Sequence, residues 1–565
     1  SNARFFDMKH SMTASLVLSI SLIALQSFAA PKDELSIAVN AEFDTINPIV
    51  NTMIAAVLVD DAVIRPLVKL TTKGETVPVL IKEIPTLKNK KLSITQDKSG
   101  KHLRAEIEIL PEAVWGDGHP LTCKDLEAAW KIGSDSLVAT PNRDDYQNIK
   151  SIQIDPKNPK KCTVALEKPQ YNFYLNLPRP IPAHIELPVF EAHKGKLHGY
   201  EHNSYYVANI SNPGLYNGPY RVQEMKFGSH ITLIPNEKFF GEKPYFKKIV
   251  LRFILNTSAI EANLLSGNVQ VSSSSGMSFD QALAFEKRIK SQKLPYEVQF
   301  VPGVMYSHLD VNLDDPILKD LKVRQALAYS FNRKEMTQSF FENRQPEAYH
   351  FSTPFDDWYT DDPKLIKTYL FDRAKATKLL EEAGWKMGDK GYRFKDGKKL
   401  SLTLSGVADN KINELIAVYL QNQWKQIGIE LQIKTFPPRV FFSQTMRKRE
   451  FQLGLLTWVG SPNSVDISSL SSTMIPSEAN GWSGHNRSGW RNPQVDTWLT
   501  EAAQEFDVKK RIALMRKVLK VYTEELPSLP AYYRSNNSIY PKDLKGYEIS
   551  GHNYTEFLDV EKWHY

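Results

Sequence analysis

The chain has 565 residues, more than one ordinary hydrophobic core accommodates, so its length predicts two or three domains. Hydrophobic residues make up 42% and charged residues 24% of it, a composition typical of folded globular proteins. The formal net charge of +7 comes without a dense basic block, because Lys88–Lys91 and Lys157–Lys161 are short runs beside turn residues. These runs indicate a solvated surface, and we expect no nucleic-acid partner.

The first residues carry processing signals rather than fold information. Residues 1–3 are typical of an expression-tag scar, and a positive region at Lys9 precedes Ala14–Leu25, a 12-residue run of apolar residues and serines. The small-x-small pattern that ends at Ala29 predicts cleavage there, so residues 1–29 form the tag scar and signal peptide; a buried N-terminal helix is the alternative. No cysteine lies at the cleavage point, so we expect a periplasmic protein without a lipid anchor.

The two cysteines, Cys123 and Cys162, leave two interpretations open. In an oxidising compartment the pair can form a disulfide. Two buried thiols are the interpretation that we favour, because spacing alone does not establish disulfide geometry.

Alternating and apolar runs predict strands in the first half of the chain, separated by turns. Thr122 and Asp125 form a capping box that opens a helix through Lys131, and a second helix from Ser258 stops at Gly267. The predicted strands are Leu35–Val39, Leu92–Thr95, Leu103–Leu110, Ile152–Ile154, Cys162–Leu166, Ile231–Ile234 and Ile249–Ile254.

The second half is richer in helices, which alternate with strands and therefore predict α/β lobes. The predicted helices are Leu321–Phe331, Arg373–Ala383, Asn413–Gln426 and Val508–Glu525. The predicted strands are Leu400–Leu404, Ile429–Lys434 and Phe451–Thr457. The sequence contains no internal repeat and no long low-complexity linker.

Short motifs occur in a fixed order along the chain. They are Thr45–Pro48 (TINP), Trp115–Asp125 (WGDGHPLTCKD), Asn217–Arg221 (NGPYR), Asn236–Phe240 (NEKFF), Lys322–Arg333 (KVRQAL, then NR) and Ala374–Trp385. Their order resembles that of the family 5 extracellular solute-binding proteins, which include receptors for oligopeptides, dipeptides and nickel chelates. Each motif alone is weak, and the shared order carries the resemblance.

The resemblance implies an α/β, two-lobed periplasmic-binding-protein fold of type II, from the large cluster that has an inserted extra subdomain. It implies chain crossings between the lobes near Ser272–Met277 and Pro527–Tyr533. Ligand pockets favour such domain interfaces, so we expect the solute between the lobes. The expected domains are lobe I at 30–50, 175–277 and 528–565, the inserted subdomain at 51–174, and lobe II at 278–527.

The strongest ligand candidate is the end of an apolar strand. Its residues are Thr457, Trp458, Val459, Gly460 and Ser461. In the oligopeptide and dipeptide receptors, the position three after this tryptophan is an Asp that pairs with the peptide's ammonium group, and here it is Ser461. Oligopeptide receptors also carry an Arg three residues before the tryptophan, where this chain has Leu455. A buried ammonium group without a countercharge is costly, so Asp466 is the substitute that we consider. The alternative for Trp458 is a core aromatic.

By the same resemblance, further residues match positions that line the ligand site, and their chemistry suits a wet pocket with neutral donors and aromatics. They are Thr52, Met53 and Asn142 in the first lobe, Ser273 and Ser274 at one crossing, Tyr306 and His308 in the strand beyond it, and Tyr532 at the return.

The resemblance therefore implies a receptor without enzymatic activity, cofactor or metal. We expect a monomer that closes its lobes on a peptide or peptide-like solute and delivers it to an inner-membrane ABC permease. A receptor of the same fold for a metal chelate or a sugar is one alternative, with His308 as a chelate contact.

A zinc metallopeptidase is the distant alternative, because His198–His202 (HGYEH) matches the H-x-x-E-H pattern. That mechanism needs both histidines on one face of a regular helix, together with a third ligand. Gly195, Gly199 and Asn203 argue against a helix here, so we expect a polar surface loop.

Overall fold

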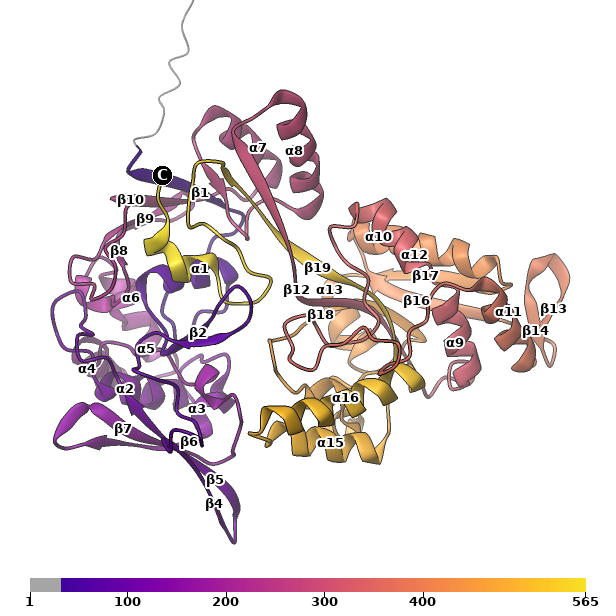
Figure 1. The fold of residues 1–565 in the computed structure, drawn as a ribbon, viewed down its shortest axis with the longest axis horizontal. Coiled ribbons are helices and arrows are strands. Elements are labelled where there is room, and N and C mark those ends of the chain that lie inside the picture. The colour runs from indigo at the N-terminus through magenta and orange to yellow at the C-terminus, as the bar shows by residue number, and fades with distance from the viewer. Residues whose placement is uncertain (1–31) are drawn as a thin grey trace, which may run out of the picture.

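Two lobes joined by a pair of long strands make up the computed structural model, which describes residues 32–565 (Figure 1). The predicted tag scar, signal peptide and cleavage point at Ala29 lie outside the described residues. We call residues 32–301 and 536–565 lobe I, and residues 306–533 lobe II. No helix within the described range is long and apolar enough to cross a membrane.

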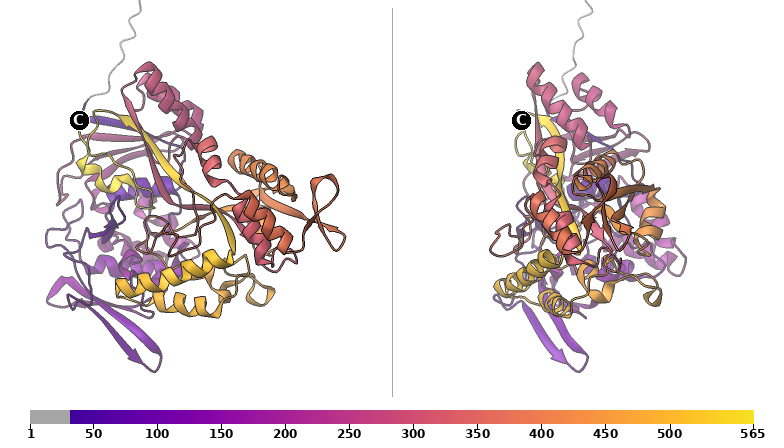
Figure 2. Two further views of the ribbon diagram at one scale, coloured as in Figure 1. Left: turned by 45° about the vertical axis from the view of Figure 1, so that its right-hand side comes forward. Right: turned by 90° about the vertical axis from the view of Figure 1, so that its right-hand side faces the viewer.

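One mixed sheet runs through both lobes and supplies both connections between them. Within residues 32–565 it has ten strands, in the order β17-β16-β18-β12-β19-β11-β1-β10-β9-β8. The crossing strands are β12 (Tyr296–Val311) and β19 (Ser528–Pro541), which pair antiparallel with a register shift between Pro302 and Tyr306. They run side by side from lobe I into lobe II in each view (Figures 1 and 2).

The crossing requires a glycine at position 303. A Cβ atom there would lie 2.4 Å from the carbonyl oxygen of Gly551, which belongs to a lobe I loop that packs against β12. Contacts that short do not occur, so a larger residue would force the loop and the strand apart.

The lobe I half of the sheet separates two cores. Leu35, Ile37 and Val39 of β1 pack with α1 and residues near the C-terminus, whereas Ala38 packs on the other face with α7 and α8, as strand alternation requires. The sheet strands of this lobe are β1 (Glu34–Val39), β8 (Tyr220–Lys226), β9 (His230–Pro235), β10 (Lys248–Phe253) and β11 (Val271–Ser272). The helices are α1 (Ile54–Val63), α4 (Ala183–His193), α5 (Gly199–Asn203), α6 (Tyr205–Ala208), α7 (Thr257–Ser266) and α8 (Phe279–Gln292).

A smaller sheet and helix α2 form the inserted part of lobe I. The predicted capping box of Thr122 and Asp125 is confirmed and opens α2. A disulfide joins Cys123 in α2 to Cys162 in β7. The interpretation of two free thiols is therefore wrong, because the packing of this helix on the sheet brings the two Cα atoms to 6.1 Å. The elements are β2 (Val68–Leu70), β3 (Thr76–Pro78), β4 (Leu92–Asp97), β5 (Gly100–Glu108), α2 (Cys123–Ser134), α3 (Arg143–Gln147), β6 (Ile149–Asp155) and β7 (Asn158–Leu166).

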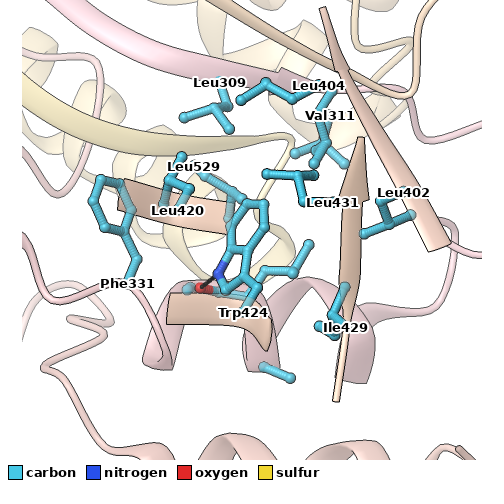
Figure 3. Close-up of a cluster of buried hydrophobic side chains, with 14 of the residues drawn as sticks. Leu309, Val311, Phe331, Leu402, Leu404, Leu420, Trp424, Ile429, Leu431 and Leu529 are labelled. Atoms are coloured by element: carbon cyan, nitrogen blue, oxygen red, sulfur yellow. Dashed lines mark hydrogen bonds between the residues drawn. The ribbon is translucent and has the colours of Figure 1, made fainter. Parts of the chain in front are cut away.

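The core of lobe II forms around Trp424 (Figure 3). This side chain is fully buried among leucines such as Leu420 and Leu431, and its indole nitrogen donates to the carbonyl of Leu327 at 3.3 Å. The helices of lobe II are α9 (Leu321–Tyr329), α10 (Arg333–Phe341), α11 (Arg373–Glu382), α12 (Lys411–Lys425), α13 (Pro438–Val440), α14 (Ile467–Leu470), α15 (Pro493–Ala503) and α16 (Val508–Glu525). The strands are β13 (Lys386–Met387), β14 (Arg393–Lys395), β15 (Lys398–Lys399), β16 (Ser401–Val407), β17 (Glu430–Phe436) and β18 (Leu453–Val459).

We propose that the first chain crossing lies further along the chain than Ser272–Met277. Phe285 of α8 and Phe300 of β12 pack with Ala38 of β1, so α8 and the start of β12 belong with lobe I. We therefore propose a division of the lobes near Pro302 in place of residue 277. The remaining domain limits stay predictions.

Candidate functional site

Alternate residues of β12 and β18 form one wall at the lobe II end of the crossing. Tyr306 is paired in register with Trp458, and His308 with Leu456. Successive side chains of a strand point to opposite faces, so these four side chains share one face, and Asp310 follows on it.

These side chains line a cavity beneath Trp458, with about 540 Å³ of empty space that is partly open to solvent. The loop residues His485 and Arg487 and the helix residue Tyr522 line other parts of it. The ring of Trp458 is half-buried, and its centroid lies 4.9 Å from that of His485. Trp458 therefore borders the cavity and also packs beside His485.

A second cavity adjoins the first, because Tyr306, Trp458 and Asp466 line both. The end of β18 and the turn that follows it form the rim of this cavity with Val459, Gly460 and Ser461. Two cavities that share a wall suit an elongated solute, with one part held beneath Trp458 and the rest along the rim.

Burial shapes the chemistry of the first cavity. Tyr306 is buried, which raises the pKa of its phenol, and its hydroxyl lies 3.2 Å from that of Ser528. The rings of Tyr306 and His308 stack at 4.4 Å, and Nε2 of His308 lies 3.1 Å from a carboxylate oxygen of Asp310. Desolvation lowers the pKa of Arg487 and nearby Asp310 opposes that effect, yet an arginine stays charged.

Two carboxylates border the second cavity. Asp466 caps α14 by accepting a hydrogen bond from the backbone N–H of Ser469 at 3.0 Å. Asp356 accepts hydrogen bonds from the backbone N–H groups of Thr353 and Asn463, both at 2.8 Å. Desolvation raises the pKa of Asp356 to about 6. Asp466 is therefore the better placed of the two for a solute cation, since it also borders the first cavity.

Lobe I touches lobe II beside these cavities. The hydroxyl of Tyr171 donates to the carbonyl of Asn463, and the guanidinium of Arg511 lies 3.8 Å from the Tyr171 ring. Phe506, in the turn between α15 and α16, packs against the core of the inserted part. The two lobes therefore meet directly on one side of the site.

A further cavity lies in lobe I near this contact, where Thr52, Tyr174, Arg179 and Tyr554 line it. Burial raises the pKa of Tyr174, and Arg511 of lobe II opposes that rise, so the cavity lies toward lobe II. The guanidinium of Arg179 is already paired with Asp61.

The structure brings some of the predicted ligand residues together and separates others. Trp458, Val459, Gly460, Ser461, Tyr306 and His308 gather at the two adjoining cavities. Thr457, Tyr532 and Ser274 instead line a cavity on the opposite face of the crossing sheet. Thr457 faces away because it is adjacent to Trp458 in a strand, and its hydroxyl lies 2.7 Å from that of Ser307.

The other predicted ligand residues lie apart from Trp458. Ser273 is buried and donates to the carbonyl of Ala38 at 3.0 Å. Thr52 lies in the lobe I cavity, Met53 precedes α1 with 40% of its surface exposed, and Asn142 is exposed at the start of α3. Their roles stay predictions.

The sequence interpretation missed Arg487, His485 and Asp310 as lining residues. Strand alternation could have predicted Asp310, since it lies two residues beyond His308 and four beyond Tyr306 and therefore shares their face of the strand. His485 and Arg487 lie in a loop without periodicity, so no local pattern places them.

The His198–His202 segment differs from the expected loop. Gly199–Asn203 form a one-turn helix, because His198 adopts a left-handed conformation with φ of 57° and starts the turn. Nδ1 of His198 lies 2.7 Å from a carboxylate oxygen of Glu201. Across residues 32–565, no group of three or more His, Cys, Asp or Glu residues is positioned to hold a metal ion.

Comparison with known proteins agrees with this architecture. The model of the bacterial extracellular solute-binding proteins, family 5, matches residues 77–476. The oligopeptide-binding protein AppA of Bacillus subtilis is 26% identical over 471 residues, covering 82% of this chain and 80% of its own. The nickel-binding periplasmic protein of Escherichia coli is 25% identical over 531 residues, covering 91% of this chain and 92% of its own.

A solved structure shares the fold. The oligopeptide-binding protein from Thermus thermophilus, complexed with a pentapeptide, superposes with a TM-score of 0.67 at 25% identity, covering 94% of this chain and 96% of that one. The predicted α/β, two-lobed fold of type II is thereby confirmed, and it defines a periplasmic-binding-protein class of receptor. The chain belongs to the family 5 extracellular solute-binding proteins, as its motifs indicate.

Proposed function

We propose that this protein is a receptor that binds a peptide or peptide-like solute between its lobes and presents it to a membrane ABC permease. The observation that carries the proposal is the pair of adjoining cavities that share Trp458 at the sheet crossing. A solute held there touches lobe II through β18 and lies beside the contact of Tyr171 with Asn463. A solute that also reaches Tyr171 binds better when the lobes meet, and its binding then favours that form.

The peptide class is supported by the end of β18 and by the relatives. An extended peptide adds main-chain hydrogen bonds to an exposed strand end, while roomy cavities accept its side chains. The relatives include oligopeptide-binding proteins, and we propose the same class of ligand for this chain. In this proposal Asp466 pairs with the ammonium group of the peptide, because position 461 carries Ser instead of Asp and Asp466 borders both cavities.

The protein acts by binding alone in this proposal, as a monomer, and without enzymatic activity or a cofactor. Export through cleavage after Ala29 and release without a lipid anchor into the periplasm belong to the same proposal. Sequencing of the mature N-terminus from the native host tests the export step, and a start at Ala30 is the expected result.

Mass spectrometry of the solute that copurifies with the protein tests the class of ligand. The protein is purified without refolding, denatured, and the released small molecules are identified. A peptide or a peptide-like molecule in a 1:1 ratio is expected. A metal chelate or a sugar would support the alternative of the same fold with another solute, for which His308 and His485 supply imidazole groups in the cavity.

A further inference from the structure

We propose that the cavity beneath Trp458 accepts an anionic group of the solute, and that Arg487 is the residue that binds it. This inference rests on the proposed function, because it assigns a chemical class to the solute of the same site. A carboxylate is the anion that a peptide offers, either on an acidic side chain or at its C-terminus.

Arg487 is half-buried at the cavity and differs from Arg324 and Arg333, two buried arginines of lobe II that have backbone acceptors. Arg324 donates to the carbonyl groups of Glu525 and Leu318, and Arg333 donates to the carbonyl of Pro530. Within residues 32–565, the guanidinium of Arg487 makes no hydrogen bond or ion pair, although its Nε atom is buried. An unmade hydrogen bond of a buried charged donor is unfavourable, so an acceptor from a solute would be stabilising here.

The nearby carboxylates do not neutralise this guanidinium directly. Asp310 is engaged with Nε2 of His308 at 3.1 Å, and Asp466 is engaged with the N-terminus of α14. Neither forms an ion pair with Arg487 in the described part of the chain. The planar fork of a guanidinium matches a carboxylate in two-point geometry, which makes it the natural partner for that group.

The two charges of opposite sign occupy different parts of the site. Asp466 borders both cavities, whereas Arg487 borders the one beneath Trp458. A solute whose ammonium group meets Asp466 at the boundary therefore extends its anion toward Arg487. The indole of Trp458 lines both cavities and therefore borders the space that holds the two charged groups of the solute.

Calorimetric titration with matched solutes tests the inference. The panel contains tripeptides of alanine in which one position at a time is Glu or Gln, each with a free or an amidated C-terminus, and the non-peptide pair glutarate and glutaramide. Arg487→Gln is compared with wild type. Arg491→Gln is the matched control, because Arg491 lies in the same loop but is exposed and paired with Asp314.

Wild type and Arg491→Gln should prefer one acidic member over its neutral partner by about tenfold or more, and Arg487→Gln should lose that preference. The position of the preferred Glu, or a requirement for the free C-terminus, identifies which carboxylate enters. Equal affinity for acidic and neutral members, a preference that survives in Arg487→Gln, or no binding by any member would overturn the inference. Binding of peptides without a preference for the acidic members would overturn this inference but leave the proposed function standing. Binding of glutarate and of no peptide would support Arg487 as the residue that binds an anion, but it would reject a peptide as the solute.

Discussion

The hydroxyl of Tyr171 in lobe I donates a hydrogen bond to the backbone carbonyl of Asn463 in lobe II. Asn463 is held in turn by Asp356, which accepts from its backbone N–H at 2.8 Å, and Arg511 covers the Tyr171 ring. These groups belong to separate lobes that are connected through β12 and β19. Any opening of the lobes that admits a solute must break this contact.

Replacing Tyr171 with Phe should favour the open form. The substitution removes the hydrogen bond to Asn463 but keeps the ring beside Arg511, so the loss corresponds to one net hydrogen bond. We expect the affinity for the solute to fall by about two- to tenfold, since less of the protein is in the binding-competent form. Small-angle scattering of the unliganded variant should give a larger radius of gyration. Tyr245→Phe, at an exposed lobe I tyrosine, is the control. Unchanged affinity and radius would remove the contact from the closing equilibrium.

The stability of the protein should depend on pH through Asp356. Its pKa is raised to about 6 by desolvation, above that of an unfolded aspartate, so the folded state binds the proton more tightly. The stabilising contribution is complete below pH ~4 and is lost as the pH rises through about 6. Urea unfolding of wild type and Asp356→Asn should therefore diverge between these values, with wild type losing about 1–3 kcal/mol relative to the variant.

The matched control for this pH effect is Asp357→Asn, at an exposed neighbouring carboxylate. That variant keeps the Asp356 carboxyl group, so it should still lose stability as the pH rises through about 6, although the lost charge of Asp357 lowers the pKa of Asp356 slightly. A constant difference between wild type and Asp356→Asn from pH 4 to pH 7 would show that folding does not raise the pKa of the Asp356 carboxyl group.

Position 461 carries Ser where the peptide receptors carry Asp, and substitutions there and at Asp466 test how the ammonium group of a peptide is bound. Ser461→Asp places a carboxylate at the rim of the second cavity, so peptides with a free amino terminus should bind more tightly. Asp466→Asn should weaken the same peptides by about tenfold and leave N-acetylated peptides unaffected, because those carry no ammonium charge. Calorimetry with both peptide forms measures this. Equal losses for the two forms would mean that Asp466 acts through its cap on α14 instead.

Trp458 and Trp424 should differ in their contributions to stability. Trp424 is fully buried in the lobe II core, so Trp424→Ala should cost about 3–5 kcal/mol of unfolding free energy. Trp458 is half-buried at a cavity, and Trp458→Ala should cost less than about 2 kcal/mol in the unliganded protein. Urea unfolding of both variants decides between them. Equal losses would place Trp458 among the core aromatics.

The local elements followed from the sequence because their signals are local. Each predicted strand or helix overlaps an observed one, and α7 begins and ends where Asn256 and Gly267 cap it. The crossing strand β12 was harder to predict, since Pro302 and Gly303 break its sequence pattern although the strand continues through them. The first crossing, for which we propose a shift from Ser272–Met277 to near Pro302, depends on tertiary packing: α8 can be assigned to a lobe only through its contacts with Ala38 and Phe300.

The candidate site was predictable along the strands and not in the loops. Trp458 and Ser461 follow from a motif at a strand end, and Tyr306 and His308 lie in the adjacent strand of the sheet. Strand alternation also shows why Thr457 cannot share a face with Trp458. Arg487 depends on how a loop folds back over β18, which is decided by tertiary contacts such as Arg449 donating to the Arg487 carbonyl at 2.8 Å.

The most direct measurement for the account is a calorimetric titration of the released and identified solute against wild type and Trp458→Ala. Wild type should bind one molecule of solute, and the variant should bind it at least about tenfold more weakly, because an aromatic side chain at the centre of a site dominates its binding energy. The same affinity and stoichiometry in both proteins would contradict the account, since the solute would then bind away from the cavities that Trp458 joins.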